Sequence, residues 1–248
     1  MHKRGELLAG TSGWNYYDWK GRFYPADLKA KDYLAHYARH FLTTEVNYSF
    51  YHLPKPTTYS NWASQVPKDF VFAVKASRFI THIRRFREVE ETWQKFVDNA
   101  AVLGQQLGPI LLQLPPSFRQ DTKLLEGFLQ DTRMRRGSKD LRLAFEFRHA
   151  TWFDDPVYEI LEQHGAALVI AHSQPYPQAP CLVTAPFVYL RFHGPGRLFA
   201  SEYSREELES WAKKIRTWLT RGMAVYAYFN NDYHGYALEN AKLLGDLV

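Results

Sequence analysis

Charged and apolar side chains alternate in two short segments of the chain. In LRLAFEFRH, Glu146 and Arg148 stand two residues apart among phenylalanines, and in FVYLRFHG, Arg191 and His193 have the same spacing. Residues two apart in a β-strand lie on one face, so each pair points in a single direction. A glutamate walled by aromatic rings can have a shifted pKa, and histidine titrates near neutral pH. Glu146 and His193 are therefore predicted to be a general acid–base pair.

Neighbouring side chains supply groups that bind anions. Arg148 and Arg191 carry forked donors that match a carboxylate or a phosphate, and Lys75 adds a point charge. We therefore expect an enzyme that binds a small anionic substrate, phosphorylated compounds included. The predicted catalytic set is Glu146, His193 and Lys75, and the predicted substrate-binding set is Asn47, Gln113, Arg148, Arg191, Asn230, Asp232, Trp14, Tyr48 and Trp152.

Some of these side chains have simpler explanations. Glu146 could be a plain counter-ion of Arg148 or Arg191. Lys75 could form a Schiff base, but an ion pair with Glu45 or Glu146 would explain an inward-facing lysine equally well. For the whole cluster, the alternative to a binding site is a network in which the acidic and basic side chains satisfy one another.

The elements that must position these residues repeat along the chain. Apolar runs typical of strands occur at 7–12, 43–48, 70–75, 109–114, 141–147, 167–172, 187–193 and 224–230. Amphipathic segments typical of helices lie between them, at 27–40, 57–65, 88–106, 123–132, 156–164, 205–220 and 235–247. Eight units over 248 residues give 31 residues per unit, the spacing of an α/β fold of the TIM-like (β/α)8 type. An open, doubly wound sheet is the alternative.

Alternation inside each predicted strand indicates which side chains enter the barrel. In the fifth strand, Leu143, Phe145 and Phe147 form the apolar face, which leaves Glu146 and Arg148 to point inward. The same reasoning sends inward Glu45, Asn47, Lys75, Gln113, His172, Arg191, His193 and Asn230, with Asp232 just beyond. These residues stand at or near strand C-termini, so the site is predicted at the C-terminal mouth of the barrel.

One crossover departs from the repeat. The segment 173–186 contains four prolines and cannot form a helix of useful length, so an irregular crossover is expected between the sixth and seventh strands. No linker or low-complexity tract interrupts the alternation. We therefore predict a single TIM-like barrel domain over residues 1–248.

Composition is that of an ordinary folded protein. Hydrophobic residues make up 46% and charged residues 23%, which excludes disordered, collagen-like and coiled-coil chains. The lone Cys181 cannot form an internal disulfide. No signal segment opens the chain and no apolar run approaches the roughly 18 residues of a membrane span, so we expect a cytoplasmic protein with no membrane partner. The oligomeric state is left open.

Histidines also gather near the predicted strand C-termini, namely His82, His149, His172 and His193. Two inward arginines would repel a cation, and no tight His-x-x-x-His spacing occurs there, so no metal is predicted, although these four residues stay open as ligands. His149 breaks the inward parity and could simply cap the next turn. Gly10-Thr11-Ser12-Gly13 matches neither a phosphate loop nor a dinucleotide-binding loop, so no cofactor is predicted.

A basic segment after the third predicted strand suggests a different class of function. It contains Arg78, Arg84, Arg85 and Arg87, interleaved with phenylalanines, at the same end as the mouth. These groups could follow phosphates while mouth aromatics stack bases, so nucleic-acid binding, with or without phosphodiester chemistry, is the alternative function. A solvated basic loop is the simpler explanation, because a net charge of +5 is small for a nucleic-acid-binding protein. The second basic run, at 133–136, precedes the fifth strand and is expected in a solvated turn at the opposite end.

Eight short strings along the chain belong together. They are Gly10-Thr11-Ser12-Gly13-Trp14, Trp19-Lys20-Gly21-Arg22-Phe23-Tyr24-Pro25, Glu45-Val46-Asn47 with Phe50-Tyr51, Val74-Lys75 with Thr81-His82, Leu112-Gln113-Leu114-Pro115-Pro116-Ser117-Phe118, Phe145-Glu146-Phe147-Arg148-His149 with Trp152, Arg191-Phe192-His193-Gly194, and Tyr228-Phe229-Asn230-Asn231-Asp232. Through them the chain resembles the domain of unknown function 72 family, the YecE-like proteins, over about residues 7–245. The resemblance implies a TIM-like barrel, and it implies no activity because the biochemistry of that family is unassigned.

Overall fold

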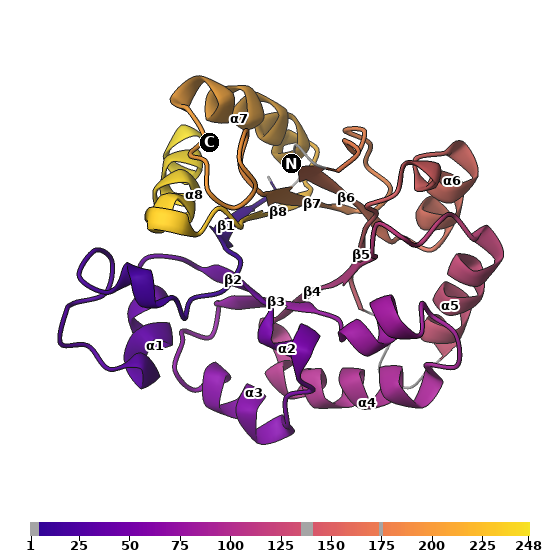
Figure 1. Cartoon of the computed structure of the whole chain (residues 1–248), viewed down its shortest axis with the longest axis horizontal. Coiled ribbons are helices and arrows are strands. Elements are labelled where there is room, and N and C mark those ends of the chain that lie inside the picture. The colour runs from indigo at the N-terminus through magenta and orange to yellow at the C-terminus, as the bar shows by residue number, and fades with distance from the viewer. Residues whose placement is uncertain (1–4, 135–140, 174–175) are drawn as a thin grey trace.

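The computed structural model describes residues 5–134, 141–173 and 176–248, and in these residues eight parallel strands close into a barrel in chain order (Figure 1). The strands are β1 (Leu7–Thr11), β2 (Thr43–Val46), β3 (Val71–Lys75), β4 (Leu107–Gln113), β5 (Leu143–Glu146), β6 (Ala167–His172), β7 (Phe187–Phe192) and β8 (Ala224–Phe229). The register from Leu7↔Val225 to Thr11↔Phe229 joins β1 to β8. This closure confirms the predicted TIM-like (β/α)8 barrel and excludes the open sheet.

Helices surround the ring of strands (Figure 1). They are α1 (Tyr33–Tyr37), α2 (Tyr48–Tyr51), α3 (Pro56–Ala63), α4 (Glu90–Ala100), α5 (Thr122–Met134), α6 (Asp155–Gln163), α7 (Arg205–Thr220) and α8 (Tyr236–Leu247). Shorter helical turns occupy Tyr17–Trp19, Ala30–Asp32, Phe79–Ile83, Ala101–Gln106, Ala150–Trp152 and Tyr233–Gly235. None of the helices in the described part of the chain is both long enough and apolar enough to span a membrane.

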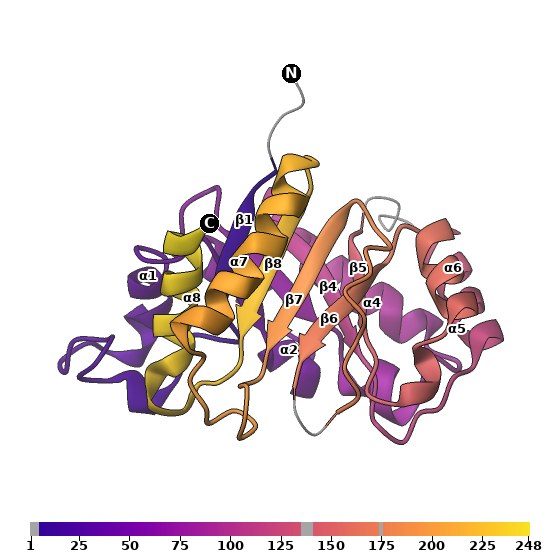
Figure 2. The same cartoon turned by 90° about the horizontal axis from the view of Figure 1, so that it is seen from above.

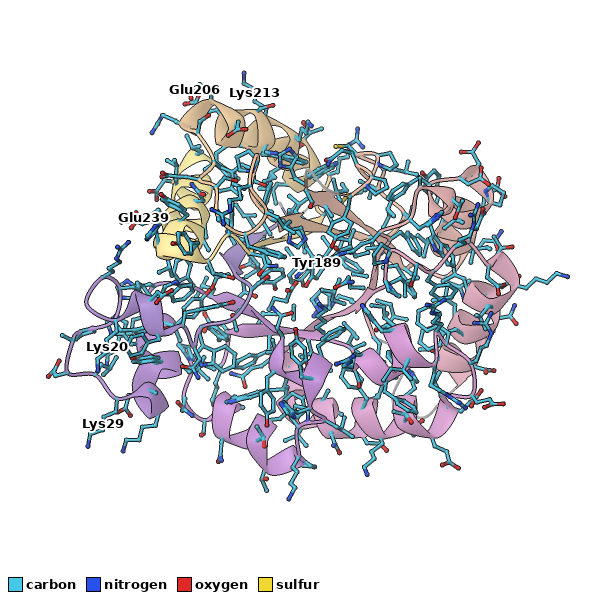
Figure 3. All side chains as sticks on the ribbon, viewed as in Figure 1. Lys20, Lys29, Tyr189, Glu206, Lys213 and Glu239 are labelled. Carbon is cyan, nitrogen blue, oxygen red and sulfur yellow. The ribbon has the colours of Figure 1, made fainter. Side chains whose placement is uncertain are left out.

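Two apolar clusters divide the core as strand alternation predicts. The inner cluster combines small residues such as Ala73 and Ala144 with large rings such as Tyr189, Tyr226 and Tyr228, so side chains of unequal volume fill the barrel. Tyr189 lies inside the ring of strands in Figure 3. The outer cluster, between strands and helices, includes Leu143, Phe145, Phe147, Leu190 and Phe192. The inner and outer faces of β5 and β7 are therefore those expected from the sequence.

The sixth strand differs from its prediction at His172. Ala167, Val169 and Ala171 belong to the inner cluster, so His172 lies on the opposite, outward face. Its Nδ1 is 2.8 Å from the Tyr203 hydroxyl oxygen, and Tyr203 belongs to the outer cluster. The prediction that His172 points inward was wrong. Two of the three residues on the inner face are alanines, and an alanine does not indicate from sequence which face of a strand is buried.

In the segments between strands, local interactions determine where a helix begins and ends. Helix α7 begins as predicted, because the Ser204 hydroxyl accepts from the amide of Glu207, whose carboxylate accepts from the amide of Ser204. The segment predicted as a helix at 27–40 is α-helical only over Tyr33–Tyr37. Between β6 and β7, the described residues 173 and 176–186 contain no helix, as the prolines predict.

Helix α2, which sequence patterning did not predict, fixes the geometry of the mouth. The predicted strand at 43–48 ends at Val46, and the chain turns at once into Tyr48–Tyr51. Buried Ser49 donates a hydrogen bond of 2.6 Å to the carbonyl oxygen of Lys75 and so attaches α2 to the end of β3. The C-terminal ends of β6, β7 and β8 point to the side opposite the N-terminus in Figure 2, and α2 lies on that same side.

Candidate active site

A buried ion-pair network joins three strands at the C-terminal end of the barrel. Arg191 on β7 donates to both oxygens of Glu45 on β2, with Nε–Oε2 at 2.9 Å and Nη2–Oε1 at 2.7 Å. Its Nη1 donates to Oε2 of Glu146 on β5 at 2.5 Å. Because β2, β5 and β7 are not neighbours in the ring, the network crosses the barrel interior.

The Glu45 carboxylate accepts further hydrogen bonds. The Ser12 hydroxyl donates to Oε1 at 2.8 Å, and the Tyr189 hydroxyl donates to Oε2 at 2.8 Å. Burial alone would raise the pKa of the Glu45 carboxyl, but the charge and hydrogen bonds of Arg191 outweigh it and hold that pKa below its usual value. Glu45 is therefore an ionised anchor for Arg191.

Glu146 is held by two arginines. Besides Arg191, the Nε of Arg148 donates to Oε1 of Glu146 at 2.8 Å. Burial would raise the pKa of the Glu146 carboxyl, but the charges of Arg191 and then Arg148 hold that pKa well below its usual range. A carboxylate that stays ionised and occupied is a weak general acid or base. This geometry favours the counter-ion interpretation of Glu146.

His193, the predicted partner of Glu146, is fully buried. Its Nε2 lies 3.3 Å from Nη1 of Arg191 and 3.6 Å from Oε1 of Glu146, and its Nδ1 lies 3.1 Å from Nδ2 of Asn230. Burial and then the charge of Arg191 lower the pKa of His193 to about 4, so the ring is neutral at pH 7. Neither Glu146 nor His193 is among the described residues that line the cavity of the mouth.

That cavity has a volume of about 660 Å³, which suits a small molecule. The predicted site residues that line it are Asn47, Lys75, Gln113, Arg148, Arg191, Asn230 and Asp232. Arg78 and His82, from the segment after β3, also contribute to its wall. The strands and their following loops thus bring most of the predicted substrate-binding set into one cavity.

Lys75, the last residue of β3, presents its amine to the cavity. Its Nζ donates to Oε1 of Gln113 at 2.8 Å and lies 4.1 Å from the centre of the Phe50 ring. Burial, followed by the charge of Arg191, lowers the pKa of Lys75 to about 7. In the part of the chain that the structure describes, no carboxylate forms an ion pair with it. The alternative of a Lys75 pair with Glu45 or Glu146 is therefore not observed.

Asp232 lies just beyond β8 in the same cavity. Its Oδ1 is buried and has no hydrogen-bond partner among the described residues. The Tyr16 hydroxyl beside it donates to the carbonyl oxygen of Ser12 at 2.5 Å. Burial is the main cause that raises the pKa of the Asp232 carboxyl to about 7. Lys75 and Asp232 are therefore two cavity groups whose pKa values both lie near neutral pH.

The predicted mouth aromatics fall in two places. Trp14 and Tyr48 line a neighbouring groove of about 670 Å³ that shares Tyr16 and Asn47 with the cavity. Trp152 is fully buried, is stacked on Phe147 with ring centres 4.7 Å apart, and donates from Nε1 to the carbonyl oxygen of Phe118 at 2.6 Å. The prediction that Trp152 contacts substrate is therefore corrected, because this ring packs in the outer core.

The basic segment is largely bonded to the chain itself. Arg84 pairs with Glu88, and Arg87 pairs with Asp121 at 3.1 Å. Arg85 donates to the Ser117 hydroxyl at 3.0 Å and lies over the Phe118 ring. Of the four arginines, Arg78 lines the cavity. In the second basic run, residues 133 and 134 end α5 and residues 135–136 lie outside the described residues.

The histidines left open as metal ligands are dispersed. His149 caps the turn Ala150–Trp152, where its Nδ1 accepts from the Thr151 amide at 3.2 Å. His82 lines the cavity, and burial with the nearby charge of Lys75 lowers its pKa to about 4. In the described residues no three His, Cys, Asp or Glu side chains stand close enough together to hold a metal ion.

The predicted site set lacks several residues that line the cavity, namely Tyr16, Phe50, Tyr51, Pro115, Pro116 and Phe199. Phe199 lies in the loop after β7, has a left-handed φ of 62°, and is 40% exposed where it borders the cavity. Strand alternation cannot locate a loop residue. The sole signal in the sequence is the Gly194-Pro195-Gly196 turn that precedes it.

Comparisons with known proteins agree on one family. The family model described as "Protein of unknown function DUF72" matches residues 8–248. The chain is 27% identical to UPF0759 protein YunF of Bacillus subtilis, over 98% of this chain and 94% of that one. It is 27% identical to UPF0759 protein YecE of Escherichia coli K12, over 75% and 74%. A solved DUF72 family protein from Thermotoga maritima is similar with a TM-score of 0.81 and 30% identity, over 98% of both chains.

Proposed function

This chain belongs to the DUF72 family of proteins of unknown function, and we propose that it is an enzyme that binds a small anionic substrate at the C-terminal mouth of its barrel. The observation that carries the proposal is a pair of cavity cations, Lys75 and Arg78, with which no carboxylate forms an ion pair in the described residues. Lys75 is buried, and a buried charge without a counter-ion is costly, whereas Arg78 is exposed and adds positive potential to the cavity wall. An anionic ligand would remove that cost.

The charge balance of the site supports the same conclusion. The carboxylates of Glu45 and Glu146 are matched by Arg191 and Arg148. Asp232 is the remaining acidic group, and burial keeps a proton on it over much of the range below pH 7. Lys75 and Arg78 then leave an excess of positive charge in the cavity.

Two groups in the cavity support acid–base chemistry. Lys75 and Asp232 each have a pKa of about 7, chiefly because of burial, and each lines the cavity. General acid–base catalysis is most efficient with such values. We therefore assign this role to Lys75 and Asp232 in place of the predicted pair Glu146 and His193, whose bonds to Arg191 hold the base of the site together.

Titration with sulfate tests the proposal, because sulfate keeps its double charge across the relevant pH range. Calorimetry at pH 6 and pH 8 should show tighter binding at pH 6, where Lys75 is more charged and Asp232 less so. Lys75→Met should weaken binding at pH 6 by roughly tenfold, the value of one charge-assisted hydrogen bond. Arg78→Gln should weaken it at both pH values.

Lys68→Gln is the matched control, since Lys68 is an exposed lysine far from the lining of the cavity. It should bind sulfate as the wild-type protein does. The proposal is wrong if sulfate binding is absent at low ionic strength, or if Lys75→Met and Lys68→Gln bind sulfate equally well.

A further inference from the structure

The amine of Lys75 has surroundings that suit a nucleophile. It stands at the end of β3 with 8% of the residue exposed, and that exposed part borders the cavity. The oxygen of Gln113 accepts one of its hydrogen bonds at 2.8 Å, and the Phe50 ring covers it at 4.1 Å. One polar contact and one ring fix the position of Nζ and leave its cavity side for a substrate.

Burial is the main cause that disfavours an ammonium ion at Lys75, and the charge of Arg191 adds to it. Glu45 and Glu146, the carboxylates that could neutralise it, are occupied by Arg191 and Arg148. Lysine amines become reactive when they are desolvated or placed beside another cation, because either condition favours the neutral form with a free lone pair. Lys75 meets both conditions.

The cavity that holds Lys75 also holds groups for an anion. Arg148 and Arg78 line the same cavity. The guanidinium of Arg148 bonds to Glu146 through Nε and lies 4.3 Å from the centre of the Tyr176 ring, which leaves its Nη groups for an anion. We infer that Lys75 forms an imine with a small carbonyl compound that carries an anionic group, with Arg148 and Arg78 binding the anion. This inference rests on the anion site of the proposed function and adds a nucleophilic role for Lys75.

The reaction balances without a further reactant. The Nζ lone pair attacks the carbonyl carbon, the C=O π electrons move to oxygen, and that oxygen takes a proton while nitrogen loses one, giving a carbinolamine. A second proton then converts the hydroxyl into water, which leaves as the C=N bond forms. Asp232 lines the same cavity and retains a proton up to about pH 7, so it can supply this proton.

Reductive trapping on the wild-type protein tests the inference. Glyoxylate is a small anionic aldehyde, and cyanoborohydride reduces its imine to a stable carboxymethyl-lysine that peptide mass spectrometry locates. At pH 7, Lys75 should be labelled at least roughly tenfold faster than Lys68, because far more of a lysine with a lowered pKa is neutral. The labelling rate at Lys75 should level off above about pH 7.

Two further measurements separate the possible results. Sulfate should slow labelling of Lys75 and leave Lys68 unchanged, and formaldehyde, which has no charge, should prefer Lys75 less strongly than glyoxylate does. Labelling of Lys75 at the rate of exposed lysines overturns the inference, and if sulfate still binds, the proposed function survives with Lys75 as a charge only. Fast labelling of Lys75 without any sulfate binding would refute the proposed anion site and, with it, the binding of the carbonyl compound through its anionic group.

Discussion

A single carboxyl, Asp232, should set part of the pH dependence of stability. Its pKa is raised mainly by burial, from 3.8 to about 7, so the folded chain holds a proton that the unfolded chain releases. The cost of ionising Asp232 therefore appears as pH rises above 3.8 and is complete above about 7. Asp232→Asn removes that cost and should stabilise the fold at pH 8 by on the order of a few kcal/mol, with little effect at pH 4.

Urea unfolding of both proteins at pH 4, 6 and 8 measures this difference. Asp69→Asn provides the control, since Asp69 is an exposed aspartate. Its unfolding free energy should follow that of the wild-type protein at each pH. A gain in Asp232→Asn that is the same at all three pH values would show that the carboxyl does not titrate near neutrality.

For single residues, the sequence predicts which way a side chain points better than it predicts which residue that side chain bonds to. Alternation along β3 and β4 correctly sends Lys75 and Gln113 inward, because strand geometry alone decides the face. It cannot decide which carboxylate an arginine binds, since the long side chain of Arg191 reaches both Glu45 and Glu146. The shifted pKa of Asp232 depends on burial by loops that come together only in the fold.

The segment after β3 is an element whose basic residues hold two loops together. Arg85 has a left-handed φ of 49° and bonds to Ser117 and Phe118 in the loop after β4. Arg85→Ala should lower the free energy of unfolding by about 1 kcal/mol. It should also speed amide hydrogen exchange in residues 79–87, because the segment would lose its attachment. Mass spectrometry of peptides from that segment measures the exchange.

Arg119→Ala is the matched control, as Arg119 is an exposed arginine of the same loop. It should leave exchange in residues 79–87 unchanged. The two variants also bear on the alternative of nucleic-acid binding. Fluorescence anisotropy of a labelled single-stranded oligonucleotide should show no tight binding with a steep dependence on salt. If such binding occurs, Arg85→Ala should weaken it more than Arg119→Ala does only if the basic segment binds nucleic acid. Such binding would favour the alternative.

Elements with strong periodicity were predicted well, and those set by local contacts were not. The residues of α7 match the prediction because its amphipathic pattern is clear in the sequence, and a capping box at Ser204 begins the helix at the expected residue. Helix α2 replaced the expected end of a strand, since Ser49 bonds to the end of β3, a contact between separate segments. His172 was assigned to the wrong face of β6 because its neighbours include small alanines.

For the whole molecule, the Arg191 network links strands on different sides of the barrel. Glu45, Glu146 and Arg191 come from β2, β5 and β7, so the fold of three separate units meets at one guanidinium. Sequence spacing predicts that these residues share the interior, and closure of the ring is what brings them into contact. The network therefore couples the integrity of the barrel to the shape of the cavity that Arg191 lines.

Arg191→Met tests this coupling because it leaves Glu45 buried without a cation and leaves Glu146 with Arg148 alone. At pH 7 it should lower the free energy of unfolding by about 3–5 kcal/mol, the usual cost of breaking a buried ion pair. Arg191 holds the pKa values of the Glu45 and Glu146 carboxyls below the usual value of a glutamate. The stabilising effect of Arg191 is therefore present at pH values above the usual glutamate pKa, and it is lost as the pH falls through the lowered pKa values. In the variant, both carboxyls can instead take up protons, so its deficit should shrink towards pH 4.

Arg142→Met is the control for this loss, since Arg142 lies at the other end of β5 and donates to the Leu107 carbonyl oxygen at 3.0 Å and to the Tyr226 hydroxyl. Its deficit should not shrink in acid, because neither partner is a carboxylate. Adding Glu45→Gln and Glu146→Gln to Arg191→Met should recover part of the stability at pH 7, since both fully buried carboxylate charges are removed and the charge left without a carboxylate, on Arg148, is partly exposed. Chemical unfolding measures each free energy, and an Arg191→Met deficit independent of pH, or no recovery in the triple variant, would show that the network does not hold the barrel together through charge.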